Sequence, residues 1–371
     1  MTGVPAGGAS TAGGALPTGA STAGGALPTG ASTAGGALPT GAFPPGGPRL
    51  PDPRTPPRAP GSVRRTSSID TSRPDGLDGD AFMDGRARDI VTRPDGSTEV
   101  VAQASLWARV GGFTRELKEL RSEPDRPALH ELAGALVGPG FRGRVDRLVP
   151  EERDAHTPLY LLLDDFPGAA LVSGYALLHA GSVGRHHDGY LDAQVDQCAG
   201  WAAEGGMMQF IRREQRAPQP LGPRAPVLER PDDAESWHEM AELAPHGMRR
   251  RRRIDVGRAE GGAHPVNVFF RDSHVDGDGR ETVVHEYGVS ALVDAASLIV
   301  RSVVAKADVL PWAECPAAVG SAPLLVGQPV GDLRPWGRAN LRGTTTCTHL
   351  NDTLRGLADV GALIEELAAG V

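Results

Sequence analysis

The stretch Arg65-Thr66-Ser67-Ser68-Ile69-Asp70 is echoed later in the chain by Arg250-Arg251-Arg252-Arg253-Ile254-Asp255. Further matches follow each stretch in the same order: Arg88-Asp89, Asp95-Gly96 and Pro127-Ala128 correspond to Arg271-Asp272, Asp278-Gly279 and Pro316-Ala317. The spacing between matches drifts slowly, which is typical of an old tandem duplication whose loops have changed in length. The sequence therefore predicts two copies of one structural module.

Hydrophobic periodicity in the second copy predicts strands followed by helices. The segments Val266–Val275 and Glu281–Val293 alternate in the manner of strands, and Asp276-Gly277-Asp278-Gly279 between them is typical of a hairpin turn. A third strand is expected over Ser297–Ala305. Helical spacing begins at Pro316 and includes a last helix from about Thr348 to Leu367.

The first copy shows the same order of patterns. Strands are expected over Phe82–Thr92, Thr98–Val110 and a segment near Phe113–Leu120, with a turn at Pro94-Asp95-Gly96 and helices from Pro127. Each module is then a set of antiparallel strands followed by helices. We therefore expect an α+β fold built from two tandem, duplicated modules.

The front of the chain has a different composition. Residues Gly8–Thr18, Gly19–Thr29 and Gly30–Thr40 are identical copies of GASTAGGALPT, and a Pro/Arg-rich stretch follows them. Such a repeat cannot bury enough apolar surface to offset its chain entropy. We therefore expect a disordered arm over 1–62, a first module over 63–179, a connecting segment over 180–248, and a second module over 249–371.

Composition limits the classes of partner. The net charge of −8 argues against general nucleic-acid binding. The run Arg249–Arg253 is expected to be a solvated start of a strand or a set of ion pairs between the modules, with an anionic ligand as the lesser alternative. We find no signal peptide and no run of about 18 apolar residues, and the three cysteines fit reduced thiols. A cytoplasmic protein with no membrane partner is expected, whereas the oligomeric state is not indicated.

The reactive residues are confined to the second copy. Cys315, Cys347 and His349 correspond to Arg126, His156 and Pro158 in the first copy, so only the second copy offers two thiols and an imidazole. His285 lies on a predicted strand and could approach them, with Glu286 on the opposite face. We therefore take Cys347, His349, Cys315 and His285 as the candidate catalytic residues.

Three interpretations of these residues remain open. Cys347 could be a nucleophile at the start of a helix, with His349 or His285 as its base; His349 would need a non-helical first turn to reach it. Cys315, Cys347 and His349 could bind zinc with Cys198 or His285, although the spacing differs from common zinc modules, so no metal ligand is assigned. Alternatively, the cysteines are buried apolar side chains and His349 bonds a backbone carbonyl.

Four stretches together resemble a known bacterial family: Arg65–Asp70, Gly85–Asp89, Glu314–Ala318 and Thr346–Asp352. The chain from Arg64 onward is similar to the family called domain of unknown function 2889, in its actinobacterial form. The Cys-Thr-His-Leu motif is the most specific element. The resemblance implies no assigned activity, only an association with the breakdown of aromatic compounds and acyl thioesters.

The sequence favours an enzyme or a binding protein for a small acyl or aromatic metabolite, with its site in the second module. The alternative is a non-catalytic interaction protein in which the cysteines are structural. No P-loop, dinucleotide-binding glycine motif, serine-hydrolase elbow or HExxH motif occurs, so no particular cofactor is indicated.

Overall fold

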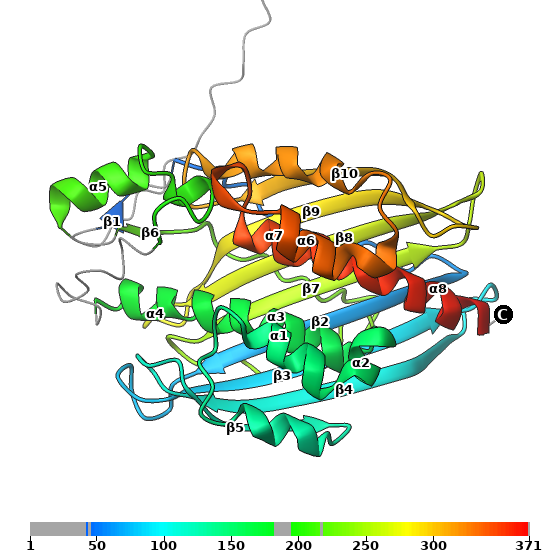
Figure 1. Cartoon of the computed structure of the whole chain (residues 1–371), viewed down its shortest axis with the longest axis horizontal. Coiled ribbons are helices and arrows are strands. Elements are labelled where there is room, and N and C mark those ends of the chain that lie inside the picture. The colour runs from blue at the N-terminus through cyan, green and yellow to red at the C-terminus, as the bar shows by residue number, and fades with distance from the viewer. Residues whose placement is uncertain (1–41, 44–45, 182–193, 216–217, 370–371) are drawn as a thin grey trace, which may run out of the picture. The chain divides into compact units, whose positions relative to one another are not determined.

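The computed structural model describes residues 42–43, 46–181, 194–215 and 218–369. Most of the predicted disordered arm therefore lies outside the described residues, as does the middle of the connecting segment. Residues 40–371 form one compact unit. The two predicted modules are halves of that unit, and their architecture is α+β (Figure 1).

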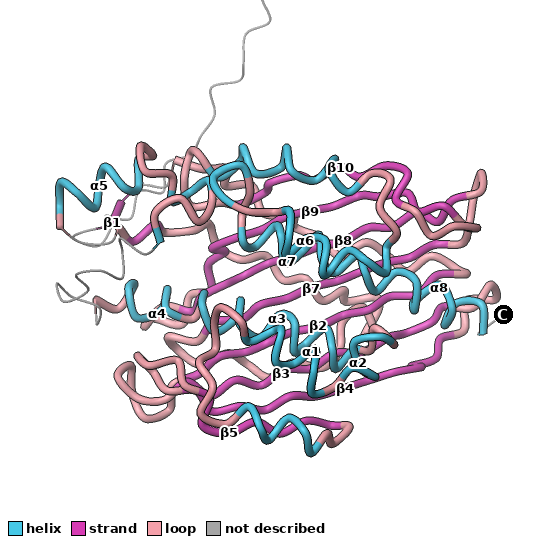
Figure 2. Tube along the Cα trace, in the orientation of Figure 1, coloured by secondary structure: helices cyan, strands magenta, loops and turns pink. Residues whose placement is uncertain are grey.

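The centre of the fold is an eight-stranded antiparallel sheet with the order β10-β9-β8-β7-β2-β3-β4-β5 (Figures 1 and 2). Its strands are β2 (Ser62–Ser72), β3 (Ala81–Thr92), β4 (Thr98–Val110), β5 (Leu117–Glu123), β7 (Met248–Gly257), β8 (Ala263–Val275), β9 (Glu281–Asp294) and β10 (Val300–Val309). Two short strands, β1 (Ala42–Phe43) and β6 (Gln219–Pro220), form a separate parallel pair.

Most helices lie over one face of this sheet, which we call the helix face (Figure 1). Those of the first half are η1 (Pro127–Leu132), α1 (Phe141–Leu148), α2 (Pro150–Asp154), α3 (Pro158–Val172) and α4 (Gly174–His179). Those of the second half are η4 (Cys315–Leu325), η5 (Val330–Asp332), α6 (Leu333–Asn340), η6 (Gly343–Thr345), α7 (Thr348–Arg355), η7 (Gly356–Asp359) and α8 (Val360–Ala369). The connecting segment adds η3 (Ala199–Trp201) and α5 (Gly206–Glu214).

The two halves meet edge to edge through β2 and β7, which pair antiparallel along ten residues of β2, from Ser62 to Thr71. Each half then continues outward as a meander of three further strands. The predicted hairpin turns occupy the same place in both meanders, between β3 and β4 and between β8 and β9. Gly96 and Gly279 sit in these turns with φ of 86° and 79°, which suits glycine.

Most of the expected strands and helices are confirmed, with small differences at their ends. The central strands β2 and β7 were not predicted as strands, because their sequences are polar and show no apolar alternation. The last helix is interrupted by the 3-10 turn η7. The expectation of a solvated start to the arginine run is wrong, since all five arginines are buried in the middle of the sheet.

Strand alternation sends the arginines of β7 to both faces of the sheet. On the helix face, Arg252 forms a bidentate pair with Asp165 of α3, with N–O distances of 2.6 and 3.0 Å. Arg250 pairs with Asp272 of β8 and with Asp352 of α7. The ion-pair interpretation of the run is therefore correct for these residues, and the pairs join β7 to the helices of both halves.

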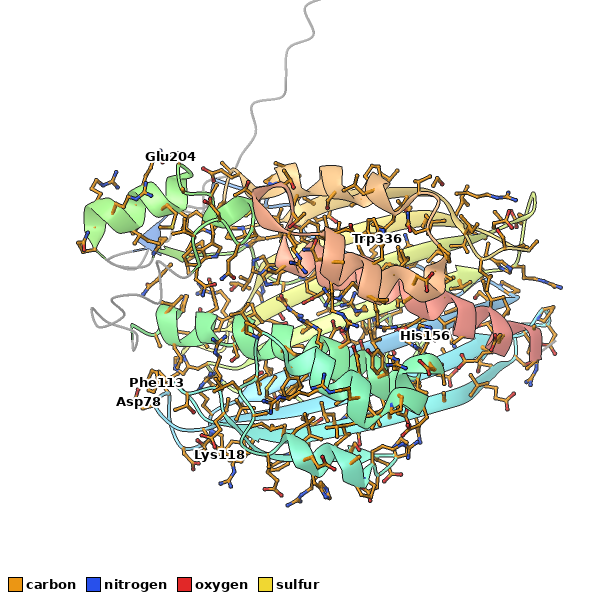
Figure 3. The ribbon with its side chains drawn as sticks, viewed as in Figure 1. Asp78, Phe113, Lys118, His156, Glu204 and Trp336 are labelled. Atoms are coloured by element: carbon orange, nitrogen blue, oxygen red, sulfur yellow. The ribbon has the colours of Figure 1, made fainter. Side chains whose placement is uncertain are left out.

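A second group of buried ion pairs lies beside the first. Arg65 of β2 pairs with Asp89 of β3 and lies 3.0 Å from Asp359 of η7. Arg334 of α6 contacts Asp359 and also His156, which precedes α3 and is labelled in Figure 3. Helices from the second half are thus held to a strand and a loop of the first half.

The opposite face is covered in its middle by two chain segments. One is residues 46–61, which we call the N-terminal strap, and the other is 228–247. Thr55 of the strap is buried and accepts a 2.8 Å hydrogen bond from Trp237 Nε1. Arg58 pairs with Asp233 at 2.7 Å. The predicted disordered arm therefore extends too far toward the C-terminus, because the strap is packed.

One stretch of helix is long and apolar enough to span a membrane by length and composition. It covers Pro158–His179, has a mean hydropathy of 1.3 and is 83% buried inside the protein. Most of its apolar side chains pack on the first half of the sheet, and Val172 and Ala176 pack against Met248 and Val284 of the second half, as expected for a core helix.

Asp165→Asn should lower the free energy of unfolding by about 3–5 kcal/mol, because it leaves the Arg252 guanidinium buried without its carboxylate. Chemical denaturation measures this loss. The control is Asp84→Asn, whose pair with Arg86 is exposed at both ends and should cost under about 1 kcal/mol. Equal losses in the two variants would contradict the importance of the buried pair.

A chain lacking residues 1–60 should melt at a lower temperature than a chain lacking 1–41. The longer deletion removes the contacts of Thr55 and Arg58, each worth about 1 kcal/mol, whereas the shorter one keeps them. Calorimetry of both chains provides the measurement. Identical melting temperatures would show that the strap adds nothing to stability.

Candidate functional site

Three polar side chains meet on the helix face where α7 crosses β8 and β9. Asp272 of β8 and His285 of β9 are direct cross-strand partners in the sheet. His349 lies in the first turn of α7, which contacts both strands. Pairing of strands and docking of one helix thus bring together residues that are far apart in the sequence.

The two imidazole rings are stacked on each other. Their centroids are 3.6 Å apart and their planes differ by 17°. Burial lowers the pKa of His349 to about 3, with the charge of Arg250 adding to the effect. Burial also lowers the pKa of His285 well below its usual value, and the neighbouring His349 lowers it further. Both rings are therefore neutral at neutral pH.

Asp272 is held in place by Arg250 and faces both imidazoles. Its carboxylate accepts hydrogen bonds of 2.9 and 3.1 Å from Arg250 Nε and Nη2. Asp272 Oδ2 lies 3.5 Å from His349 Nε2 and 3.7 Å from His285 Nδ1. The carboxylate is completely buried, so its orientation is set by these neighbours rather than by water.

Cys347 approaches His349 from the other side. The two residues would diverge inside a helix, but Cys347 is the N-cap of α7, with extended φ and ψ of −134° and 133°. Its Sγ therefore lies 3.7 Å from His349 Nδ1. The Thr348 hydroxyl is 3.4 Å from the same nitrogen. The first turn of α7 is helical, contrary to the sequence argument, and the contact arises because Cys347 lies just before the helix in an extended conformation.

The surroundings of Cys347 act on its thiol in opposite directions. Burial raises the pKa of the thiol, whereas Tyr287 and the backbone N–H groups of Leu350 and His349 lower it. The Tyr287 hydroxyl makes no hydrogen bond that meets normal geometry among the described residues. The resting site therefore holds a neutral thiol beside a neutral imidazole, with hydrogen-bond donors near the sulfur.

Cysteine, histidine and aspartate thus form a continuous series of contacts, Cys347–His349–Asp272. A proton on His349 Nε2 would point to Asp272 and leave the Nδ1 lone pair directed at the Cys347 thiol. A nucleophile, a base and a carboxylate that orients the base are the parts of a catalytic triad.

The other predicted site residues have different surroundings. Cys315 begins η4 inside the apolar core, near Cys198 and Cys347, and burial raises its pKa well above the usual value. It takes no part in the contacts between Cys347, His349 and Asp272. Glu286 lies on the opposite face from His285, as alternation predicted, and pairs there with Arg271.

Sequence reasoning did not assign Asp272, Arg250 or Tyr287 to the site. A signal for the first two was present, because Arg250 and Asp272 belong to stretches that match Arg65 and Asp89 of the first copy. The structure forms the same Arg–Asp pair in both halves. Tyr287 shares a face of β9 with His285 by strand alternation, but its residue type alone indicates no chemistry.

Asp272, His285 and His349 also form a group that could hold a metal ion. One ligand atom from each residue lies within 4.8 Å of the others. His285 Nδ1 is buried and has no hydrogen-bond partner among the described residues. Two neutral imidazoles and a carboxylate are suitable ligands for zinc. The cysteines of the earlier zinc interpretation are not members of this group.

Comparison with known proteins identifies a family but no activity. Residues 248–362 match the model of the family described as "Protein of unknown function (DUF2889)". The match contains Arg250, Asp272, His285, Cys347 and His349. No curated protein and no solved structure matches the chain.

The lowered pKa of His349 makes stability sensitive to acid. An unfolded histidine titrates near pH 6.5, so the unfolded chain binds this proton first as the pH falls. The contribution is fully present above about pH 6.5 and is lost progressively toward pH 3, by about 2 kcal/mol at pH 5. Denaturation of the wild type and His349→Gln between pH 7 and 4.5 should show a shallower pH dependence in the variant.

The control for this measurement is His130→Gln, because His130 is exposed. That variant should keep the wild-type dependence of stability on pH. A wild-type slope that is retained in His349→Gln would show that His349 is not buried in its neutral form.

Proposed function

We propose that this protein is a cysteine-dependent enzyme that transfers or hydrolyses a small acyl group carried as a thioester. Cys347 is the nucleophile, His349 is the general base and Asp272 orients the base. The observation that carries the proposal is the series of distances, 3.7 Å from Cys347 Sγ to His349 Nδ1 and 3.5 Å from His349 Nε2 to Asp272 Oδ2. These distances lie within the looser range of a catalytic site without substrate.

The reaction proceeds in two balanced steps. His349 Nδ1 takes the proton of the Cys347 thiol while Sγ attacks the carbonyl carbon of the thioester. The leaving thiolate then takes that proton from the imidazolium, and the acyl group is left on Cys347. Water or another acceptor attacks the acyl-enzyme with His349 again as the base, which releases the acid or the new ester and restores the thiol.

The neutral resting state fits general-base catalysis. A thiol with a raised pKa holds its proton until a substrate approaches, and His349 is unprotonated and able to accept it. The positive charge that develops on the imidazole is balanced by Asp272. The Tyr287 hydroxyl and the N–H groups at the start of α7 are donors for the negative charge on sulfur or oxygen.

The substrate class is inferred from the apolar side chains around Cys347. Cys347 and Tyr287 belong to an apolar cluster, and the Phe270 ring lies 6.3 Å from His349. A small aliphatic or aromatic acyl group suits such surroundings better than a charged one. Reduced thiols at this site also favour a cytoplasmic location.

We also propose that the two halves arose by tandem duplication and that the site was acquired afterwards. Arg65–Asp89 and Arg250–Asp272 are matching pairs at matching places in the two halves. In the sequence correspondence, Cys347 and His349 stand where the first half has His156 and Pro158, at the start of a helix in both halves. Replacement of these two residues would supply the nucleophile and its base at an existing helix start.

The second candidate function is a metal centre formed by Asp272, His285 and His349. It is favoured by the mutual distances of these ligand atoms and by the unpartnered His285 Nδ1. The two candidates differ in the need for His285. A metal centre requires both imidazoles, whereas the triad requires His349 alone.

Incubation with benzoyl and acetyl thioesters of N-acetylcysteamine should release free thiol and give an acylated protein in mass spectra. Cys347→Ala should abolish acylation, because no other described thiol has an imidazole placed as its base. His349→Asn should lower the rate about 100-fold or more, since a general base contributes that much. Peptide mapping should place the acyl group on Cys347.

The matched control is Cys315→Ala, which removes a buried thiol that lies outside the triad. It should retain acylation, and His285→Asn should retain most of it. Acylation that survives in Cys347→Ala would overturn the proposal. Stoichiometric zinc in the purified protein, lost in His285→Asn together with activity, would establish the metal centre instead.

A further inference from the structure

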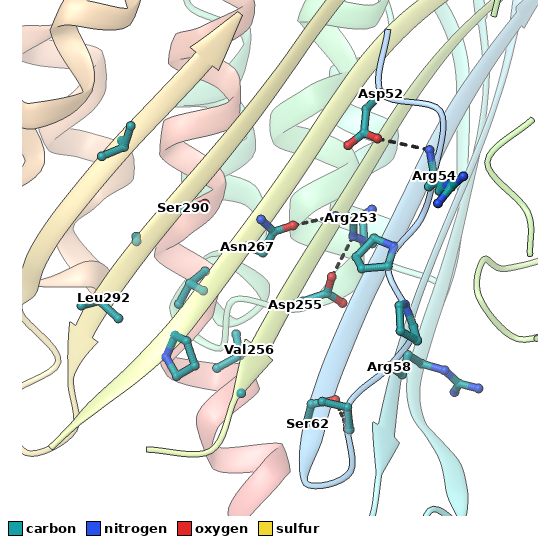
Figure 4. A pocket seen from close by; sticks show the side chains of 18 of the residues that line it. Asp52, Arg54, Arg58, Ser62, Arg253, Asp255, Val256, Asn267, Ser290 and Leu292 are labelled. Atoms are coloured by element: carbon teal, nitrogen blue, oxygen red, sulfur yellow. Dashed lines mark hydrogen bonds and ion pairs between the residues drawn. The ribbon is translucent and has the colours of Figure 1, made fainter. Parts of the chain in front are cut away.

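A groove lies on the face of the sheet opposite to the proposed active site. Its volume is about 740 Å³, and it is bordered by the N-terminal strap and by strands β7 to β10 (Figure 4). Cavities of this size hold small organic ligands. The sheet separates this groove from Cys347 and His349, so an occupant would not be the molecule that reacts with the thiol.

The floor of the groove is apolar and open to solvent. Leu292 of β9 is 43% exposed and Val304 of β10 is 67% exposed. They alternate along their strands with buried residues that face the helices, so the exposed side chains lie on the face that borders the groove. Ser290 and Ser302 lie beside them. Such a floor suits an aliphatic or aromatic body with few polar groups.

One border of the groove carries a buried guanidinium with a free donor. Arg253 donates to Asp255 at 2.7 Å and to Asn267 at 2.6 Å, as the dashed lines of Figure 4 mark. Its Nη1 is buried and has no hydrogen-bond partner among the described residues. The side chain is 3% exposed. A buried N–H without an acceptor is costly, so an acceptor at this point would be stabilised.

The charges around Arg253 are not balanced. Asp255 also accepts from Arg64, at 2.5 and 3.3 Å, so one carboxylate serves two buried guanidinium groups. Arg54 lies at the border of the groove with an exposed side chain. Asp52 lines the same region and accepts from the backbone N–H of Arg54 at 3.2 Å. The lining of the groove thus contains three arginines, Arg54, Arg58 and Arg253, and two carboxylates, and Arg58 is paired with Asp233 outside the lining.

We propose that this groove binds a small amphipathic carboxylate. The carboxylate accepts from Arg253 Nη1 and is attracted by Arg54, and the apolar body lies along Leu292 and Val304. The site is independent of the chemistry proposed at Cys347, and its occupant is a ligand rather than a substrate of that thiol.

Decanoate and decanol, which have chains of equal length, provide the test with the full-length protein. Calorimetric titration should show saturable binding of decanoate at one site, about tenfold or more tighter than decanol, because only decanoate carries the anion. Arg54→Gln changes an exposed side chain and should weaken decanoate severalfold while leaving decanol unchanged.

Val304→Asp places a charge on the apolar floor and should reduce decanoate affinity at least about tenfold. Its matched control is Val101→Asp, an exposed valine of β4 outside the groove, which should bind like the wild type. No saturable binding to the wild type, equal affinity for decanoate and decanol, or unchanged affinity in Val304→Asp would each overturn the proposal.

Discussion

The buried arginines of the two central strands are the constraint on which the rest of the fold depends. A guanidinium removed from water requires a carboxylate close by, since the desolvation cost is otherwise uncompensated. Arg252 forms an ion pair with Asp165 of α3, and Arg250 forms one with Asp352 of α7. Arg65 forms an ion pair with Asp359 of η7. These pairs therefore fix the positions of α3, α7 and η7 along the sheet. Apolar contacts supply most of the buried area, and these pairs determine the alignment of the layers.

The same interactions position the proposed active site. Arg250 donates a hydrogen bond to Asp352, which lies on the same helix as His349. It also donates to Asp272, which lies on the sheet and faces His349. The charge of Arg250 also helps to keep His349 neutral. Stability and site geometry are thus coupled through one guanidinium. A change in that arginine would alter both, so only variants that leave Arg250 in place separate catalysis from folding.

Sequence reasoning predicted much of the fold and part of the site. The outer strands alternate and the hairpins have clear glycine turns, so local patterns sufficed for them. The polar strands β2 and β7 were not predicted as strands, because their burial depends on partners such as Asp165 and Asp352 that are distant in sequence. Cys347 and His349 stood out by residue type, and the cap conformation of Cys347 explains their contact. Asp272 joins them only through pairing of β8 with β9, which a single sequence does not show.

The arginine run also explains why the two faces of the sheet differ. A strand alternates, so consecutive arginines must place charge on both sides of the same layer. On the helix face, Arg250 and Arg252 are matched by Asp272, Asp352 and Asp165. On the opposite face, Arg253 shares Asp255 with Arg64, and one of its N–H groups stays without an acceptor. On the helix face, Arg252 Nη1 is also without a hydrogen-bond partner among the described residues, but helices cover it, whereas Arg253 borders an open groove. The opposite face places an N–H donor without an acceptor beside an exposed apolar floor, and the proposed binding of an amphipathic anion rests on this combination.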